Sequence, residues 1–368
     1  MPSQTRIAIG LMSGTSADGV DAAVIETDGL VVHRTGAFLT VPYPDDLRLA
    51  LLSVMRTPQQ AEHDGLHRLT ARVTATNEAA CRQVMRAEGL TVATVAVVGM
   101  HGQTVLHRPQ SGFTRQLGDG AALAAALGVA VVDGFRQADI AAGGQGAPLV
   151  PVFHQALAHA LSGPLAVLNL GGVGNVTYLD GDTVLAFDTG PGNALLDDWM
   201  QRHAGLAYDK GGAVAGAGRV DQKVLSALLA HPYFDQAPPK SLDRNSFAAD
   251  GLDELSLVDG AATLAGFTVH SVRHACEHLP RAPVRWLVAG GGSHNATLMD
   301  GLRAALGVPV EPVEAVGWHA DALEAQAFGF LAVRSLRGLP LSMPSTTGVS
   351  RPMPGGVLHP CPALERQS

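Results

Sequence analysis

An α/β fold made of two similar halves is predicted by two features of the sequence. Charged residues are only 16% of the 368 residues and aromatic residues 5%, while 43 positions are glycine, a profile typical of an α/β enzyme with many tight turns. In addition, a pattern of strand, glycine turn, strand, turn and strand occurs twice, about 160 residues apart. The repeat predicts a duplicated fold with one ligand held between the halves. Because hairpins with glycine turns are common, coincidence is the alternative.

The first half of the chain begins with a predicted antiparallel meander. Apolar runs at 7–12, 20–26 and 30–41 alternate with turns of small residues. Apolar residues at helical spacing from Leu66 to Met85 predict a helix. The elements expected after it are a buried strand at 92–98, a short helix at 118–127 and a strand at 129–132.

The second half repeats this order. Strands are predicted at 165–170, 176–179 and 184–187, with a glycine turn at 171–175. The elements expected after them are a helix at 255–278, a strand at 284–289, a helix at 296–306, a strand at 308–313 and a helix at 320–336. The segment 340–360 is rich in Pro, Gly and Ser and is expected to return over the surface as an ordered tail.

The charge balance favours a small-molecule ligand. The chain has 25 Lys and Arg against 33 Asp and Glu, a net charge of −8, so neither nucleic acid nor an anionic membrane is expected as a partner. Lysine occurs only at positions 210, 223 and 240, never after glycine, which excludes the phosphate loop that ends in Gly-Lys. Nucleotide phosphates would have to be held by backbone N–H groups and a divalent cation.

A cytoplasmic location is expected. The three cysteines show no paired spacing, so neither a disulfide framework nor a zinc site is predicted. The N-terminal segment lacks the pattern of a signal peptide, and the longest apolar stretch, 121–132, is too short to span a membrane.

The turn from Ser13 to Asp21 is the first candidate for a ligand site. It combines glycines, hydroxyl side chains and the carboxylates of Asp18 and Asp21. Glycines let backbone amides approach an anion, and carboxylates beside a phosphate make sense if Mg²⁺ lies between them. An ordinary solvated turn is the alternative.

Asp188 is the candidate for acid–base chemistry. It is predicted to lie at the end of a strand, before a Thr-Gly-Pro-Gly loop that would expose its carboxylate; an aspartate that caps a helix or a turn is the alternative. His101, Gln103 and Gln145 are predicted in glycine-containing loops after apolar strands, where binding groups collect in α/β folds. Local hydrogen bonding within those loops is the alternative for each.

The segment Gly-Leu-Met-Ser-Gly-Thr-Ser-Ala-Asp-Gly-Val-Asp at 10–21 resembles the opening signature of the 1,6-anhydro-N-acetylmuramic acid kinases. This family belongs to the superfamily of actin, hexokinase and heat-shock chaperone ATPases. Further motifs follow in the order that the family shows: GMHGQT at 99–104 with His107, GGQGAPLVP at 143–151, NLGG at 169–172, DTGPGN at 188–193, GGG at 290–292 with Asn295, and DALEA at 321–325. One glycine triplet is weak evidence, but several motifs in order are specific.

The resemblance implies a duplicated ribonuclease H-like, actin-like core with two lobes and a cleft between them. Lobe I would comprise 1–140 and the tail from about 338–368, and lobe II would comprise 141–337. The implied ATP-binding residues are Gly14, Thr15, Ser16, Ala17, Asp18, Gly19, Val20, Asp21, Asn169, Gly171, Gly172, Gly290, Gly291 and Gly292. Asp18 and Asp21 would hold Mg²⁺, directly or through water. Asp188 would be the general base, and the sugar would contact Asp188, His101, Gln103, Gln145 and Glu324.

The function implied by the resemblance is ATP-dependent opening of the 1,6-anhydro ring with phosphorylation of O6. The products would be N-acetylmuramic acid 6-phosphate and ADP, in the recycling of peptidoglycan sugars, and a homodimer is expected. An actin-like or chaperone-like ATPase that switches a protein partner is the alternative. One departure from the family pattern is Leu242-Asp243, where relatives usually have Thr-Gly.

Overall fold

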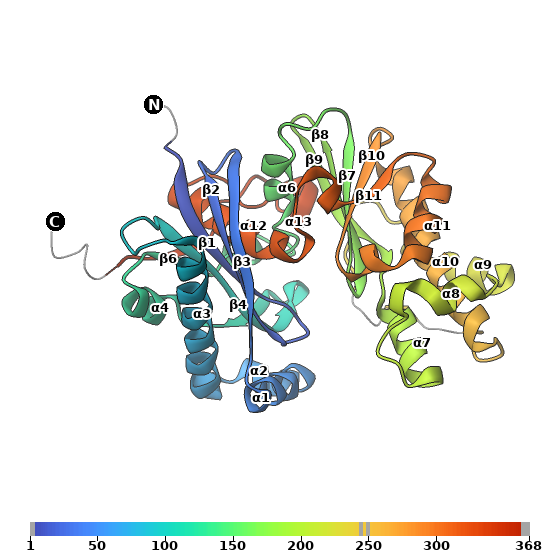
Figure 1. The fold of residues 1–368 in the computed structure, drawn as a ribbon, viewed down its shortest axis with the longest axis horizontal. Helices are drawn as coiled ribbons and strands as arrows, with labels where there is room; N and C mark the ends of the chain where they lie inside the picture. Colours follow the sequence, from blue (N-terminus) through green and yellow to red (C-terminus); the bar gives the residue numbers. More distant parts are fainter. Residues whose placement is uncertain (1–3, 243–245, 248–250, 362–368) are drawn as a thin grey trace. The chain divides into compact units, whose positions relative to one another are not determined.

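The chain divides into two compact units in the computed structural model, which describes residues 4–242, 246–247 and 251–361 (Figure 1). Unit 1 comprises Met1–Ala160 together with Ala322–Ser368, and unit 2 comprises Leu161–Asp321. No helix within the described ranges is both long enough and apolar enough to cross a membrane.

Unit 1 is an α/β sandwich around a mixed sheet. Its strands are β1 (Arg6–Ser13), β2 (Gly19–Thr27), β3 (Val32–Pro42), β4 (Val97–Arg108), β5 (Phe113–Leu117), β6 (Val131–Asp133) and β12 (Val357–His359). Its helices are α1 (Asp45–Arg56), α2 (Pro58–Glu62), α3 (His67–Glu88), α4 (Gly120–Leu127), α5 (Gln137–Ala141), α6 (Pro151–Leu157), α12 (Leu323–Leu336) and α13 (Pro344–Thr347). The strand order is β12-β6-β4-β1-β2-β3, and β5 pairs with β4.

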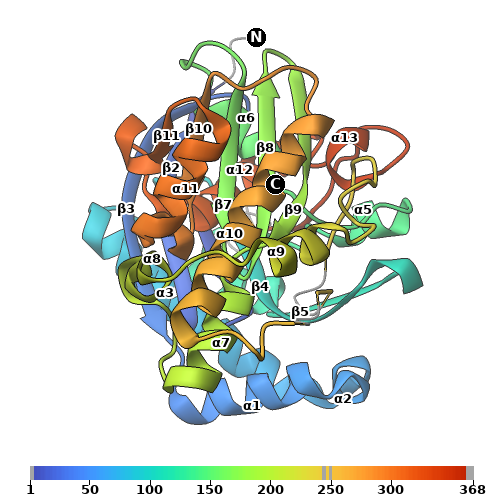
Figure 2. The ribbon, with the colours of Figure 1, turned by 90° about the vertical axis from the view of Figure 1, so that its right-hand side faces the viewer.

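Unit 2 has a second mixed sheet with the order β11-β10-β7-β8-β9. Its strands are β7 (Leu165–Leu170), β8 (Val173–Asp180), β9 (Thr183–Pro191), β10 (Arg285–Ala289) and β11 (Val310–Pro312). Its helices are α7 (Ala194–Ala204), α8 (Ala213–Ala217), α9 (Gln222–Leu229), α10 (Leu257–Ala275) and α11 (Ala296–Leu306). Figure 2 shows α10, the longest of these helices, running along this sheet.

The same topology occurs in both units, so the predicted duplication is confirmed. In unit 1, β1, β2 and β3 form an antiparallel meander, and β4 and β6 add in parallel beside β1. In unit 2, β7, β8 and β9 form the meander, and β10 and β11 add in parallel beside β7. An antiparallel meander extended by two parallel strands is the ribonuclease H-like core that the family resemblance implied.

Helix α12 packs directly on the backbone of the first sheet. Ile9 and Leu11 face the apolar core that includes α3, so Gly10 between them faces the opposite side. A Cβ on Gly10 would lie 1.7 Å from the carbonyl oxygen of Ala325, and one on Gly99 would lie 2.1 Å from that of Phe328. The close approach of helix and sheet therefore requires glycine at both positions.

This packing explains why the compact units differ from the lobes expected at 1–140 and 141–337. The segments 141–160 and 322–337 group with unit 1. Helix α12 contacts β1, β2 and β4, although it follows unit 2 directly in the chain. Near the C-terminus, β12 pairs antiparallel with β6 of the first sheet.

The predicted strand at 92–98 is wrong in its extent. Strand β4 begins at Val97 and continues to Arg108, because it pairs with β1 on one side and with β6 and β5 on the other. The motif at 99–104 therefore lies inside a strand. His101 and Gln103, which the sequence placed in a loop, are both buried strand residues.

Candidate active site

The turn between β1 and β2 presents an open stretch of backbone. Thr15, Ser16 and Asp18 are exposed. The buried Ala17 has a φ of 49°, and its N–H donates to the carbonyl of Gly14 at 3.2 Å. A Cβ on Gly14 would meet nothing nearer than Ser16 Oγ at 3.7 Å. The fold itself does not require glycine there, so the missing side chain leaves room for a ligand at the backbone.

The two aspartates of this turn differ in their surroundings. Asp18 is exposed, whereas Asp21 is half-buried and accepts the Thr40 hydroxyl at 2.5 Å. The structure brings no three potential ligating side chains together as a metal site within its described part. Two carboxylates suit Mg²⁺, which keeps several water ligands and takes phosphate oxygens.

A polar pocket of about 200 Å³ lies beside this turn within unit 1. Its lining residues are Met12, Ser13, Gly14, Thr15, His101, Thr104, His107, Arg136 and Ala147. His101 and Arg136 form its polar end, since Nε and Nη2 of Arg136 approach His101 Nε2 at 3.0 and 2.9 Å. Phe328 of α12 packs on the imidazole with ring centroids 4.5 Å apart.

The imidazole of His101 is held neutral. Burial and the charge of Arg136 lower the pKa of His101 well below its usual value, and the Gly102 backbone raises it only in part. Burial likewise lowers the pKa of His107 to about 4, with Arg136 as the second cause. Both rings are therefore uncharged at neutral pH.

The other expected sugar ligands of unit 1 lie around this pocket. Gln103 donates to the carbonyl of Gly14 at 2.9 Å, and its Oε1 is buried without a hydrogen-bond partner among the described residues. Gln145 lies in the loop after α5 and donates its N–H to Thr347. Glu324 lies in the first turn of α12. Desolvation raises the pKa of Glu324, Arg136 lowers it and Asp21 raises it.

Arg136 was not identified from the sequence. It follows the end of β6, where functional side chains collect in such folds. Nearly all basic residues of the chain are arginines, so nothing in the sequence distinguishes this one. Its Nη1 donates to the carbonyl of Gly146 at 2.7 Å. Burial lowers the pKa of Arg136 to about 10, and Glu324 and Asp139 raise it.

Two glycine turns meet at one end of the second sheet, in unit 2. The turn after β7 contains Gly171 and Gly172, whose carbonyls accept the N–H groups of Asn193 and Gly192. The turn after β10 contains Gly290, where a Cβ would lie 2.4 Å from Asn169 Oδ1. The two turns that the sequence assigned to ATP are therefore neighbours.

The glycines of these turns fall into two groups. At Gly290 the φ is 78°, and at Gly292 a Cβ would lie 2.5 Å from Leu170 Cβ, so the fold requires both. At Gly171, Gly172 and Gly291 the nearest atoms would be 3.6 to 3.8 Å away. These three glycines leave backbone accessible that a side chain would cover.

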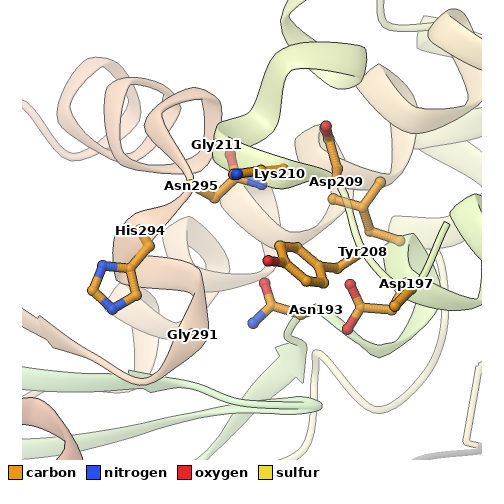
Figure 3. Close-up of a pocket in the computed structure, with 11 residues that line it drawn as sticks. Asn193, Asp197, Tyr208, Asp209, Lys210, Gly211, Gly291, His294 and Asn295 are labelled. Atoms are coloured by element: carbon orange, nitrogen blue, oxygen red, sulfur yellow. The ribbon is translucent and has the colours of Figure 1, made fainter.

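A pocket of about 590 Å³ opens beside Gly291, as Figure 3 shows. Its volume lies in the range of pockets for small organic ligands. Asn193 lies just before α7, Asp197 lies on α7 and Tyr208 follows it, whereas His294 lies in the turn after β10. Further lining residues are Leu196, Ala207, Asp209, Lys210, Gly211 and Asn295. Among these, the sequence pointed only to Gly291 and, through the family motifs, to Asn193 and Asn295.

Asp188 lies within β9 and not at its end, which corrects the sequence-based expectation. Asn175 pairs with Asp188 and Gly174 pairs with Gly190, so Thr189 is an extra residue in the strand. Such a β-bulge re-aims side chains. Pairing with β8 then continues to Pro191, which is why the strand extends beyond Asp188.

The segment 233–242 surrounds the Asp188 backbone and carboxylate. The Leu242 N–H donates to Asp188 Oδ2 at 2.7 Å, and the Tyr233 hydroxyl donates to the Asp188 carbonyl at 2.5 Å. The Asp188 N–H donates to the Lys240 carbonyl at 3.0 Å. Burial raises the pKa of Asp188 to about 6, and the Leu242 N–H lowers it. A carboxylate with this pKa can accept a proton from water near neutral pH.

These features define a class of protein. A duplicated ribonuclease H-like core, glycine turns with accessible backbone, a nucleoside-sized pocket and a half-buried carboxylate are the parts of a nucleotide-dependent phosphotransferase. The family model described as anhydro-N-acetylmuramic acid kinase matches residues 6–361. The chain belongs to this family.

Curated relatives agree with this assignment. The anhydro-N-acetylmuramic acid kinase of Rhodospirillum rubrum is 54% identical over 355 residues, covering 96% of this chain and 94% of the relative. That of Paramagnetospirillum magneticum is 53% identical over 360 residues, covering 96% and 99%. The chain is thus a sugar kinase, and membership of a kinase family implies the use of ATP. The comparisons do not support the alternative of an ATPase switch.

Solved structures are more distant. Component A of (R)-2-hydroxyglutaryl-CoA dehydratase from Acidaminococcus fermentans is 10% identical with a TM-score of 0.49, covering 90% of this chain and 99% of that one. A ROK family glucokinase from Streptomyces griseus, in complex with glucose and AMPPNP, is 14% identical with a TM-score of 0.43, covering 89% and 99%.

Proposed function

We propose that this protein opens the 1,6-anhydro ring of anhydro-N-acetylmuramic acid and phosphorylates the released O6 with ATP. The proposal rests on the surroundings of Asp188. Its carboxylate accepts a hydrogen bond from the Leu242 N–H at 2.7 Å, and burial raises its pKa to about 6. The names of the relatives, which are 50% or more identical, supply the substrate.

The substrate has no free 6-hydroxyl, because O6 is bonded to C1. Asp188 takes a proton from water, the water oxygen bonds to C1, and the C1–O6 bond breaks. O6 then bonds to the γ-phosphorus as the bond from that phosphorus to the bridging oxygen breaks, which releases ADP. Phosphoryl capture of O6 replaces the protonation that a glycosidase obtains from its second carboxylic acid.

ATP is proposed to bind through backbone groups. Gly171, Gly172 and Gly291 leave their backbone accessible beside the 590 Å³ pocket, which suits the nucleoside and its phosphates. The turn from Gly14 to Asp21 supplies the other phosphate contacts. Mg²⁺ would neutralise phosphate charge there, and Asp18 and Asp21 are the residues proposed to hold it, directly or through water.

The sugar is proposed to contact the polar pocket of unit 1 and the groups around it. His101, Gln103, Gln145 and Glu324 supply imidazole, amide and carboxylate groups for its hydroxyl and acetamido substituents. The protein is further proposed to form a homodimer, to be located in the cytoplasm and to act in the recycling of peptidoglycan sugars.

The experiment is a product analysis. The protein is incubated with ATP, Mg²⁺ and 1,6-anhydro-N-acetylmuramic acid, and both products are quantified. Equal amounts of ADP and N-acetylmuramic acid 6-phosphate are expected. Free sugar without ADP would indicate a glycosidase, and ATP turnover that does not respond to the sugar would indicate an ATPase switch.

A further inference from the structure

Arg136 is a positive charge in the polar pocket of unit 1, and no carboxylate of the described residues forms a hydrogen bond or an ion pair with it. Within the described residues its hydrogen-bond partners are His101 Nε2 and the carbonyl of Gly146, both neutral. It is the only Lys or Arg among the residues that line this pocket. A guanidinium taken partly out of water without an anion is costly, which indicates that an anion completes the site.

The neighbouring acidic groups do not take this role. Asp139 accepts hydrogen bonds from the Gly146 N–H at 2.6 Å, from the Thr347 hydroxyl at 2.6 Å and from Ser342. Its oxygens are thus committed to holding the loop and the tail together. Glu324 acts on Arg136 only through its charge, without a described hydrogen bond or ion pair between the two.

The contacts of Arg136 leave its outer donors available. A guanidinium has five N–H groups, and the three hydrogen bonds of Arg136 use Nε, one N–H of Nη1 and one N–H of Nη2. One N–H remains on each terminal nitrogen. A guanidinium N–H gives a strong, charge-assisted hydrogen bond to a carboxylate oxygen, so these two groups can receive an anion.

The rest of the pocket determines which anion fits. Met12 and Ala147 provide apolar lining, whereas His101 and His107 are held neutral beside Arg136. A pocket with a single positive charge and a partly apolar lining suits a monovalent carboxylate on a short apolar group.

We infer that the Arg136 guanidinium binds the carboxylate of the sugar substrate. His101 orients the guanidinium by accepting hydrogen bonds from its Nε and Nη2. The inference rests on the proposed function and names the group that selects an acidic sugar over a neutral one. Arg136 is a binding residue for this carboxylate, and His101 is a positioning residue.

The test compares the acidic sugar with its neutral lactyl amide, which has a similar shape. Binding of 1,6-anhydro-N-acetylmuramic acid and of its lactyl amide is measured by calorimetry without ATP, and kcat/KM is measured for both. The wild-type protein should prefer the acid by about 10- to 100-fold, the usual effect of a charge-assisted hydrogen-bonded pair. Arg136→Met should bind the acid as weakly as the amide, with amide binding changed less than about threefold.

Two variants serve as controls. Arg108→Met removes an exposed arginine of the same unit that pairs with Glu62 at 2.8 Å, and it should keep the full preference. Arg136→Lys keeps the charge without the planar pair of donors, so it should keep only part of the preference. Melting temperatures establish that each variant is folded.

The outcomes separate the inference from the function. An equal loss of acid and amide binding in Arg136→Met would assign Arg136 a structural role. A raised KM for ATP with an unchanged preference between the sugars would make a phosphate the anion. Either result would overturn the inference. Because the binding measurement needs no turnover, a wild-type protein that binds the acid selectively but forms no product would refute only the proposed function.

Discussion

The backbone N–H of Leu242 donates a hydrogen bond of 2.7 Å to the Asp188 carboxylate. This bond lowers the pKa of Asp188 against burial, which raises it to about 6. The contact comes from the main chain, so it does not depend on the identity of side chain 242. The departure from the family pattern at Leu242 therefore leaves this contact intact; Asp243 lies outside the described residues.

Asp188→Asn should abolish both ring opening and phosphorylation, because an amide cannot take a proton from water. ATP binding, measured by calorimetry, should stay within about threefold of wild type, since the variant leaves the glycine turns unchanged. Product formation at the wild-type rate would show that another group is the base.

The same substitution should raise the free energy of unfolding at high pH. The folded-state pKa of about 6 exceeds the ordinary 3.8, so proton binding stabilises the fold fully below pH 3.8, and this stability is lost as the pH rises through 6. Ionised Asp188 then costs at most about 3 kcal/mol, from about 1.4 kcal/mol per pKa unit. In urea unfolding without ligands, Asp188→Asn should be more stable than wild type at pH 8 and equal to it near pH 4. A wild-type protein that is the more stable at pH 8 would contradict the assigned burial.

The pH–rate profile should have an acid limb near pH 6. The base must be ionised, so kcat/KM should fall about tenfold for each pH unit below that value. Measurement of kcat/KM between pH 4.5 and 8, on the order of ten points, would define the limb. Full activity at pH 4.5 would exclude Asp188 as the titrating base.

Lys240 anchors the segment that contacts Asp188. Its buried ammonium donates to the carbonyls of Tyr233 and Phe234, both at 3.1 Å, and lies 3.2 Å from His278 Nε2. Lys240→Met should loosen the segment and weaken the Leu242 bond. We expect kcat to fall about tenfold, the effect of losing roughly 1.4 kcal/mol of transition-state stabilisation, and the acid limb to move to higher pH.

A lysine elsewhere in unit 2 provides the matched control. Lys223 is exposed on α9, so Lys223→Met should leave both kcat and the acid limb unchanged. If Lys240→Met lowers kcat without moving the limb, the lysine acts through overall stability and not through the Leu242 contact.

The glycines should separate into ligand-binding and structural positions. Gly171→Ala should leave the melting temperature nearly unchanged, because a Cβ there would meet no atom nearer than 3.8 Å, while KM for ATP should rise at least about tenfold through lost backbone access. Gly290→Ala should instead lower the free energy of unfolding by about 1–3 kcal/mol, because its φ is 78°. Equal effects of the two substitutions on KM and stability would remove the distinction.

The parts of the fold that could be predicted from sequence are those set by local patterns. Both meanders and their glycine turns were predicted because apolar runs and turn residues adjoin in the chain. The boundaries of the compact units could not be predicted from local patterns. Helix α12 belongs to unit 1 because it packs on the backbone at Gly10 and Gly99, which lie far from the helix in the sequence.

The candidate site shows the same division. Asp188 and the glycine turns lie in recognisable motifs, although their roles remain predictions. Arg136 and Tyr208 became evident only from tertiary structure. Arg136 meets His101 across 35 positions, and Tyr208 lines a pocket formed by two separate segments. Neither residue has neighbours in sequence that mark it.

The scarcity of lysine has a practical consequence. Of the three lysines, Lys210 lines the nucleoside-sized pocket, Lys240 is buried beside the Asp188 segment, and Lys223 is exposed on α9. An amine-reactive reagent therefore has very few side-chain targets on this protein. Lys210 can report occupancy of the pocket through protection from acylation, with Lys223 as the internal reference in the same sample, which allows ligand screening by mass spectrometry without an engineered label.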